Sequence, residues 1–200
     1  MIDATQSAAG IPVAGLLLAA GQGTRFGGGK LAVPIPIQGG ERLAIGVAAL
    51  RNLAAVLPGP VVVVHGGDPL VADYRQEGAR VVVAERAARG MGASLAEGIA
   101  SLPRGSGVVV ALADMPWIRQ ATIRLVADAV ARGALIAAPY YRGERGHPVG
   151  FAPAFRRELE SLDHDQGARA VMAARRDAIV VIDVDDPDVL RDVDTPADLR

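Results

Sequence analysis

A glycine-rich segment with two cations is the first part of this sequence that could do chemistry. Residues 18–30 read LAAGQGTRFGGGK and follow directly on the apolar run Val13–Leu18. Glycines after a strand let backbone amides turn toward an anion and let phosphates approach closely. Arg25 and Lys30 add the cations that a polyphosphate needs. The segment therefore predicts a phosphate-binding loop, in which we expect Lys30 to be exposed and dispensable for folding.

Two well-known glycine loops do not fit this segment. The Walker loop would need a glycine where Thr24 stands and a serine or threonine where Leu31 stands. The dinucleotide-binding fingerprint would need a third glycine at the position of Phe26. A plain flexible surface loop is the remaining alternative, and the strand before the glycines and the two cations among them weigh against it.

A carboxylate follows a second apolar run. Asp114 comes directly after Val108–Leu112 in the sequence Ala-Asp-Met-Pro. A side chain at the carboxyl end of a parallel strand points into the crevice where α/β sheets bind ligands. Mg²⁺ prefers one or two carboxylates together with phosphate oxygens, so Asp114 is a candidate metal ligand. The alternative is that Asp114 only caps a helix that begins near Trp117.

Three further segments carry candidate polar groups. Ser94 follows Gly90-Met91-Gly92-Ala93 and is placed to cap a helix. The polar stretch Tyr140–Val149 contains His147 and interrupts the apolar rhythm where a substrate-specific loop is expected. Near the C-terminus, Asp192 and Asp194 precede Thr195-Pro196, and either Asp194 or Thr195 could cap a final helix.

The elements that must position these groups alternate along the chain. Apolar runs predict strands at Val13–Leu18, Val61–Val64, Val81–Val83, Val108–Leu112 and Ile179–Val184. Helical spacing predicts helices at Glu41–Val56, Ser94–Leu102, Gln120–Ala131 and Gln166–Ala174. Strands that alternate with helices form βαβ units, so we expect a Rossmann-like three-layer α/β/α sandwich with a mostly parallel sheet.

The composition restricts the classes of protein. The 200 residues fit a single domain over 1–200, with residues 1–10 expected to be disordered. The absence of cysteine excludes disulfides and thiolate chemistry. A formal net charge of −1 does not favour nucleic acid or an anionic membrane as a partner. No apolar run reaches the ~20 residues of a membrane helix and the N-terminus lacks a basic start, so we expect a cytoplasmic protein.

Four of these segments together resemble a known family. The glycine loop, Ala-Asp-Met-Pro, Arg145-Gly-His147-Pro and the C-terminal Asp-x-Asp-Thr-Pro occur in the order found in MobA-like NTP transferases. The Arg-Gly-His-Pro segment resembles the corresponding segment in one branch of this family, the molybdenum cofactor cytidylyltransferases. The loop departs from the usual pattern at Phe26 and at the triple glycine 27–29.

The resemblance implies a role for each candidate residue. Lys30, Arg25 and Asp114 would be the catalytic residues. Asp114, Asp194 and, as second choice, Asp192 would hold Mg²⁺. His147 and Arg169 would recognise the acceptor. The residues implied to bind the nucleotide are Ala19, Ala20, Gly21, Gly23, Arg25, Lys30, Gly90 and Ser94.

The implied reaction moves a nucleoside monophosphate from an NTP, CTP rather than GTP, to a phosphorylated acceptor, molybdopterin, with release of pyrophosphate. Such chemistry needs positioning, cations and a metal rather than a protein nucleophile. A molybdoenzyme or its chaperone would be the protein partner. Three alternatives stay open: a guanylyltransferase or sugar- or alcohol-phosphate nucleotidyltransferase, a non-catalytic nucleotide-binding or cofactor-binding protein, and a pigment-reducing oxidoreductase.

Overall fold

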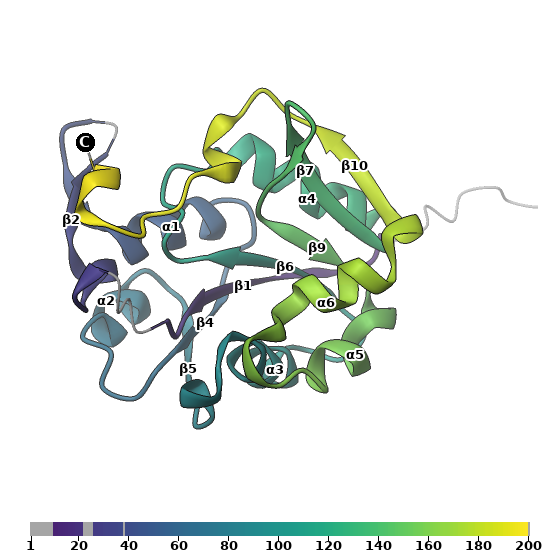
Figure 1. Ribbon diagram of the computed structural model, residues 1–200, viewed down its shortest axis with the longest axis horizontal. Coiled ribbons are helices and arrows are strands. Elements are labelled where there is room, and N and C mark those ends of the chain that lie inside the picture. The colour runs from purple at the N-terminus through teal and green to yellow at the C-terminus, as the bar shows by residue number, and fades with distance from the viewer. Residues whose placement is uncertain (1–9, 22–25, 38, 200) are drawn as a thin grey trace, which may run out of the picture.

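The structure is a computed structural model that describes residues 10–21, 26–37 and 39–199 (Figure 1). Its strands are β1 (Val13–Ala19), β2 (Pro34–Pro36), β3 (Arg42–Ala44), β4 (Val61–Val64), β5 (Arg80–Val83), β6 (Gly107–Leu112), β7 (Ile136–Tyr141), β8 (Glu144–Arg145), β9 (Val149–Phe151) and β10 (Ile179–Asp183). Its α-helices are α1 (Ile45–Ala54), α2 (Val71–Gln76), α3 (Met91–Ser101), α4 (Gln120–Ala131), α5 (Arg156–Glu160) and α6 (Gly167–Ala174).

One sheet organises the molecule, with strand order β10-β7-β9-β6-β1-β4-β5. Strand β1 lies inside the sheet, between β6 and β4, and pairs in parallel with both. Strand β9 runs antiparallel between β6 and β7, and the short β8 pairs with β7. The sheet is therefore mixed but mainly parallel, and the carboxyl ends of β1, β4 and β6 meet at one edge.

Helices cover both faces of the sheet. On one face α1, α2 and α4 contribute Leu50, Tyr74 and Val126 to a buried cluster. On the other face α3, α5 and α6 pack a second cluster, and Figure 1 shows these three helices grouped beside one another. Neighbouring residues of β1 face opposite sides, since Leu16 belongs to one cluster and Leu17 to the other. The predicted three-layer α/β/α architecture is confirmed.

All five predicted strands are present, with ends shifted by at most a few residues. The sequence reading missed β7 because Pro139 lies in its middle, and a proline cannot donate to a strand ladder. Pro139 is tolerated because, on the side of β7 that faces β8 and β9, it falls between two pairings: β9 pairs with β7 at Ile136 and Ala137, and β8 pairs from Tyr140 onward. On the other side of β7, Pro139 stands opposite Ile182 of the parallel strand β10. Strands β7 and β8 form an antiparallel hairpin. The polar stretch Tyr140–Val149, predicted as a substrate-specific insertion, contains the turn of this hairpin and leads into β9.

Two predicted helix starts are wrong. The helix expected from Glu41 begins only at Ile45, because Gly39 and Gly40 both have positive φ and turn the chain into the β2–β3 hairpin. The helix expected from Ser94 begins at Met91, so Ser94 lies in its first turn and is not its cap. The helix predicted over Gln120–Ala131 is confirmed at both ends, and the helix predicted over Gln166–Ala174 begins one residue later, at Gly167.

Two further expectations concern the N-terminus and membrane helices. Residues 1–10 were expected to be disordered, and all of them except Gly10 lie outside the described residues. Among the described helices, none has the length and apolar character needed to cross a membrane.

Candidate nucleotide and metal site

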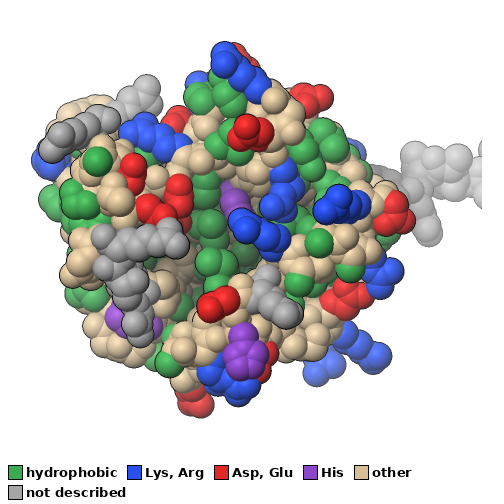
Figure 2. Space-filling model, viewed as in Figure 1, with side chains coloured by type: hydrophobic (Ala, Val, Ile, Leu, Met, Phe, Trp, Pro, Cys, Tyr) green, Lys and Arg blue, Asp and Glu red, His purple; other side chains and the backbone are tan. Residues whose placement is uncertain are grey.

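A cavity of about 550 Å³ opens at the carboxyl ends of β1 and β6. Its walls include many of the residues singled out from the sequence, namely Ala19, Ala20, Gly21, Lys30, Gly90, Ser94, Asp114 and Asp194. Figure 2 shows the hollow in the middle of this face, with red acidic side chains to its left and blue basic side chains along its right side. Parallel strands and the loops after them commonly place ligand sites here. We call this cavity the central cavity.

Lys30 is the most constrained polar residue of the central cavity. It begins the short 3₁₀ helix Lys30–Ala32, and Gly29 before it has a φ of 65°. Its Nζ donates to Asp114 Oδ2 at 2.7 Å, to the carbonyl of Val193 at 2.8 Å and to Asp194 Oδ1 at 3.4 Å. Only 9% of the residue is exposed. The expectation of an exposed lysine is wrong. The turn that carries Asp114 and the C-terminal segment that carries Asp194 enclose its side chain.

The charge of Lys30 is fixed by these contacts. Burial acts to lower its pKa, but the hydrogen bond and charge of Asp114, together with Asp194, outweigh burial and raise the pKa above its ordinary value. Lys30 is therefore a permanent cation at neutral pH.

Three carboxylates gather around this lysine. Asp114, Asp192 and Asp194 each offer an oxygen, and these oxygens all lie within 4.8 Å of one another. Partial burial and the negative charge of Asp194 raise the pKa of Asp192. We call these three residues the acidic cluster. Carboxylates held this close repel one another unless cations lie between them. Lys30 supplies one positive charge for the three carboxylates, so their spacing and remaining negative charge fit a divalent ion.

Asp114 sits in the turn after β6 and does not cap the next helix. That task falls to the buried Asp186, which the sequence reading missed. Its Oδ2 accepts hydrogen bonds from the backbone N–H of Arg119 at 3.0 Å and from Thr122 Oγ1 at 2.6 Å. Asp186 lies far from α4 in the sequence, so no local cap signal could have shown it. The side chain of Asp114 is thus left for Lys30 and the cavity.

The C-terminal segment carries the other two carboxylates to Asp114. The backbone N–H of Val193 donates to the carbonyl of Asp114 at 2.9 Å. The guanidinium of Arg191 lies 3.7 Å from the ring centroid of Trp117, a cation–π contact. Asp198 Oδ2 accepts from the backbone of Asp194 at 3.0 Å, so the cap of this last turn comes from Asp198 rather than from Asp194 or Thr195. In Figure 1 this yellow segment runs from β10 across the sheet edge to β2.

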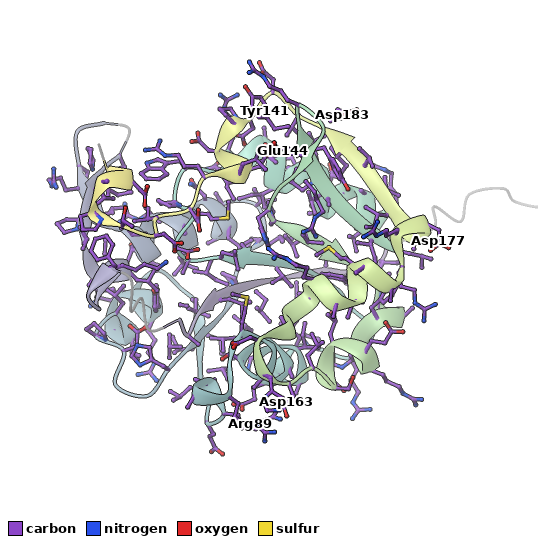
Figure 3. All side chains as sticks on the ribbon, viewed as in Figure 1. Arg89, Tyr141, Glu144, Asp163, Asp177 and Asp183 are labelled. Atoms are coloured by element: carbon purple, nitrogen blue, oxygen red, sulfur yellow. The ribbon has the colours of Figure 1, made fainter. Side chains whose placement is uncertain are left out.

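The start of α3 forms the opposite wall of the central cavity. Gly90 has a φ of 123°, and a Cβ there would collide with the backbone around His164. An ion pair between Arg89 and Asp163 holds the same two segments together, and Figure 3 shows both side chains near each other below α3. Ser94 Oγ donates back to the carbonyl of Gly90 at 3.3 Å. The fixed backbone leaves room for a ligand beside Gly90 and Ser94.

A second cavity of about 250 Å³ adjoins the first and contains His147 and Arg169. His147 lies next to the C-terminal segment, since its backbone N–H donates to the carbonyl of Val189 at 2.9 Å. Burial, followed by the charge of Arg145, lowers the pKa of His147 to about 4, so its ring is neutral. We call this space the side cavity. Arg145 also lines the side cavity. This arginine belongs to the Arg-Gly-His-Pro motif, and no role was predicted for it from the sequence.

Asp68, in the segment that follows β4, is an acidic residue near the carboxyl ends of the strands and has a structural partner. Its Oδ1 accepts from the backbone N–H of Leu70 at 2.8 Å, and His65 Nε2 lies 3.9 Å from its Oδ2. Both residues line only a small recess of about 30 Å³. This recess is too small for a nucleotide.

Comparison with known proteins identifies the family. A family model described as the MobA-like NTP transferase domain matches residues 15–179. The chain belongs to the MobA-like NTP transferase family. The match spans β1 through the start of β10 and includes the glycine loop and Asp114. The architecture described above is consistent with the Rossmann-like fold of the nucleotide-diphospho-sugar transferases.

Among curated proteins, two kinds of relative match this MobA-like chain. Nicotine blue oxidoreductase of Paenarthrobacter nicotinovorans is 30% identical over 191 residues, which cover 92% of each protein. The bifunctional protein GlmU of Xanthomonas axonopodis pv. citri is 29% identical over 143 residues, which cover 70% of this chain but only 30% of GlmU. The chain therefore spans less than a third of that second relative.

Solved structures match over nearly the whole chain. Rv0371c of Mycobacterium tuberculosis H37Rv superposes with a TM-score of 0.76 at 26% identity, covering 94% of this chain and 95% of that one. A structure of Rv0371c in complex with manganese superposes with a TM-score of 0.74 at 25% identity, covering 94% and 96%. The similarity in fold and length extends beyond the matched family domain.

The residues carried over from the family motifs separate into three groups in this MobA-like chain. Lys30 meets Asp114 and Asp194 in the wall of the central cavity, with Asp192 close beside them, and Gly90 and Ser94 line the same cavity. His147 and Arg169 line the side cavity instead. Gly23 and Arg25 lie outside the described residues.

Proposed function

We propose that this chain transfers a nucleoside monophosphate from an NTP, CTP rather than GTP, to a phosphorylated acceptor of the molybdopterin type. The observation that carries the proposal is Lys30, bound to two carboxylates of the acidic cluster beside the central cavity. An oxygen of the acceptor phosphate attacks the α-phosphorus of the NTP. The bond from that phosphorus to the bridging oxygen breaks, and pyrophosphate leaves with the electron pair. The atoms balance without a protein nucleophile.

Each residue that the family motifs assign to the nucleotide has a part in this proposed reaction. Lys30 and Arg25 would bind the phosphates. Gly21 and Gly23 have no side chain that would keep the phosphates from the backbone, and Ala19 and Ala20 have only a methyl group. Gly90 and Ser94 face the nucleoside. Because the central cavity holds about 550 Å³, it has room for a nucleotide within the usual range of roughly 300–1,000 Å³.

We further propose that the acidic cluster binds a divalent cation, Mg²⁺ in the cell. Asp114, Asp194 and Asp192 would hold it, and carboxylate oxygens are the ligands that Mg²⁺ and Mn²⁺ prefer. A bound cation would bridge the carboxylates to the phosphate oxygens and neutralise charge there. The relative Rv0371c has been solved in complex with manganese, which supports the binding of a divalent cation.

For the acceptor we propose the side cavity, with His147 and Arg169 among its ligands. A neutral imidazole can donate or accept one hydrogen bond without adding charge. Arg169 is exposed and can reach an anionic group of the acceptor. A molybdoenzyme or its chaperone would then receive the product.

Pyrophosphate release tests this proposal directly. The purified chain is incubated with each of the four NTPs, Mg²⁺ and reduced molybdopterin. Pyrophosphate is then measured with an assay that couples inorganic pyrophosphatase to phosphate detection. We expect release that depends on both CTP and the acceptor, with less from GTP. No release with any NTP would contradict a nucleotidyltransferase.

A second candidate function follows from one comparison. The relative named nicotine blue oxidoreductase matches 92% of this chain at 30% identity, so reduction of a pigment by a nicotinamide cofactor is the main alternative. Phe26 stands where a dinucleotide loop needs its third glycine, which weighs against it. Consumption of NADH or NADPH with a quinone-like dye, measured by absorbance at 340 nm, would favour the oxidoreductase.

A further inference from the structure

The side cavity has an apolar body. Leu95 of α3, Phe151 of β9 and Met172 of α6 lie in its wall, and all three are buried in the same hydrophobic cluster. At about 250 Å³ the cavity lies just below the usual range of small-ligand pockets, roughly 300–1,000 Å³. It therefore suits a compact group such as a ring system rather than a second nucleotide.

Two arginines face this apolar body without an anion. Arg145 Nη1 lies 2.8 Å from the sulfur of Met172, a weak acceptor for a charged donor. Neither Arg145 nor Arg169 forms an ion pair with any carboxylate in the described part of the chain. By contrast, Arg51, Arg86, Arg89 and Arg156 each pair with an acidic side chain. A half-buried guanidinium whose contact is a thioether has donors left for a ligand.

A third polar residue lies in the wall of the same cavity, His147. Its Nδ1 is buried and has no hydrogen-bond partner among the described residues, which is rare in native proteins. Because this atom is buried, the two arginines are the groups that an anion entering the cavity would meet. Asp165 lies at the border with the central cavity, so two guanidinium groups and one carboxylate leave the side cavity with a net positive charge.

The two cavities keep their basic groups apart. Lys30, Asp114 and Asp194 line the central cavity and not the side cavity, whereas Arg145, His147 and Arg169 line the side cavity and not the central one. The shared wall consists of Leu18, Met91, Leu112 and Asp165, none of which is basic. A phosphate that reacts beside Lys30 is therefore not the group that would bind to Arg145.

We propose that the side cavity binds a compact apolar or aromatic group that carries its own anionic substituent, and that Arg145 is the main ligand of this anion. This inference rests on the proposed function for one point only, that the bound molecule is the acceptor. The acceptor would then carry two anionic ends: a phosphate that reacts in the central cavity and a second anion that the arginines hold. Molecules that lack the second anion would be poor acceptors.

Two probes of the same shape test the charge requirement. Naphthalene-2-sulfonate carries an anion on a compact aromatic body, and naphthalene-2-sulfonamide is its neutral counterpart. Binding to the full chain is measured by calorimetry and by NMR of ¹³C-methyl methionine. Met91 and Met172 line the side cavity, while Met115 is buried in the other hydrophobic cluster and serves as an internal reference.

We expect the sulfonate to shift the Met172 and Met91 signals and to bind at least about tenfold more tightly than the sulfonamide. Arg145→Met should remove this preference while CTP binding, measured separately, is unchanged. Arg142→Gln is the matched control, because Arg142 lies in the same hairpin but is exposed and stacks on Tyr141 outside the cavity. If Arg145→Met lowers the melting temperature strongly, the exposed Arg169→Gln replaces it, with a loss of at least about threefold expected.

Equal binding of the two probes, or a sulfonate affinity that survives both arginine substitutions, would overturn the proposal. So would a sulfonate that shifts Met115 but not Met172. Arginine-dependent sulfonate binding in a chain that releases no pyrophosphate with any NTP would support the anion site and overturn the proposed nucleotidyltransferase. The two failures are therefore distinguishable.

Discussion

At the scale of single residues, the site depends on one buried lysine among carboxylates. Lys30 satisfies Asp114 and Asp194 and also the carbonyl of Val193. Removing one partner of a buried charged network leaves the others uncompensated, which costs more than losing a surface ion pair. The lysine is thus both a phosphate ligand in our proposal and a structural cation.

Replacing Lys30 with methionine should reveal both roles. We expect CTP affinity to fall roughly ten- to hundredfold, the value of one charge-assisted contact. We also expect a lower melting temperature in EDTA, with more recovery on adding MnCl₂ than the unmodified chain shows, because a divalent ion can replace the lost charge. Calorimetry and thermal unfolding with and without MnCl₂ measure the two effects. Unchanged CTP affinity would remove Lys30 from the phosphate site.

Asp114→Asn should separate charge from shape. The amide keeps an oxygen that can accept from Lys30 but loses the charge that a cation needs. We expect turnover to fall at least ~100-fold with little change in melting temperature. EDTA should reduce the unmodified chain similarly. Asp128→Asn, on the exposed face of α4, is the control and should retain full activity. Full activity of Asp114→Asn would contradict the metal site.

His147 should make stability depend on pH. Its pKa in the folded chain is about 4, against 6.5 for a free side chain. Between these values the unfolded chain binds one proton more than the folded chain, so stability falls as pH falls. From pH 7 to pH 5 this costs about 2 kcal/mol. Urea unfolding of His147→Gln should show a smaller difference between the two pH values, whereas exposed His164→Gln should keep it. Equal pH dependence in His147→Gln would contradict a buried neutral ring.

At the scale of elements, the hairpin and the C-terminal segment are locked together. The backbone N–H of His147 donates to Val189, and Val189 is fully buried. Gly146 lies so close that a Cβ there would be 2.5 Å from the Val189 carbonyl oxygen. The segment that carries two carboxylates of the acidic cluster therefore takes its position from the loop that carries His147.

Gly146→Ala should disturb both sites at once. The added methyl must displace Val189, and the displacement passes along the chain to Asp192 and Asp194. We expect the free energy of unfolding to fall by an amount typical of overpacking, about 1–3 kcal/mol, and the melting temperature to fall with it. We also expect weaker Mn²⁺ binding, measured by electron paramagnetic resonance. Gly66→Ala is the control, since its Cβ would meet nothing within 4 Å. Stability lost without any change in Mn²⁺ binding would uncouple the two elements.

At the scale of the whole molecule, one sheet joins two hydrophobic clusters. Strand residues alternate between them, as Leu16 and Leu17 do in β1. Neither cluster can lose its strands without exposing the other, so the chain should unfold as a single domain. Scanning calorimetry should give one transition with a calorimetric enthalpy close to the van't Hoff enthalpy. Two resolved transitions would contradict a single cooperative unit.

The sequence alone determined the parts of this protein whose cause is local. Apolar runs such as Val61–Val64 identified the strands because both faces of a central strand are buried. The glycine loop and the Ala-Asp-Met-Pro turn indicated the family because each is a short, continuous motif. Local patterns failed where a distant partner decides the outcome: β7 contains a proline that only its pairing tolerates, and α4 is capped by Asp186.

Only the tertiary structure decided how the site is assembled. Lys30 meets Asp114 across 84 positions of sequence and Asp194 across 164, and no spacing rule predicts such contacts. The burial of Lys30, the separation of Arg145 from the central cavity and the unpaired Nδ1 of His147 all depend on how the C-terminal segment crosses the sheet edge. Chain proximity fixes turns and helices, whereas charge and burial depend on segments that meet only after the sheet has formed.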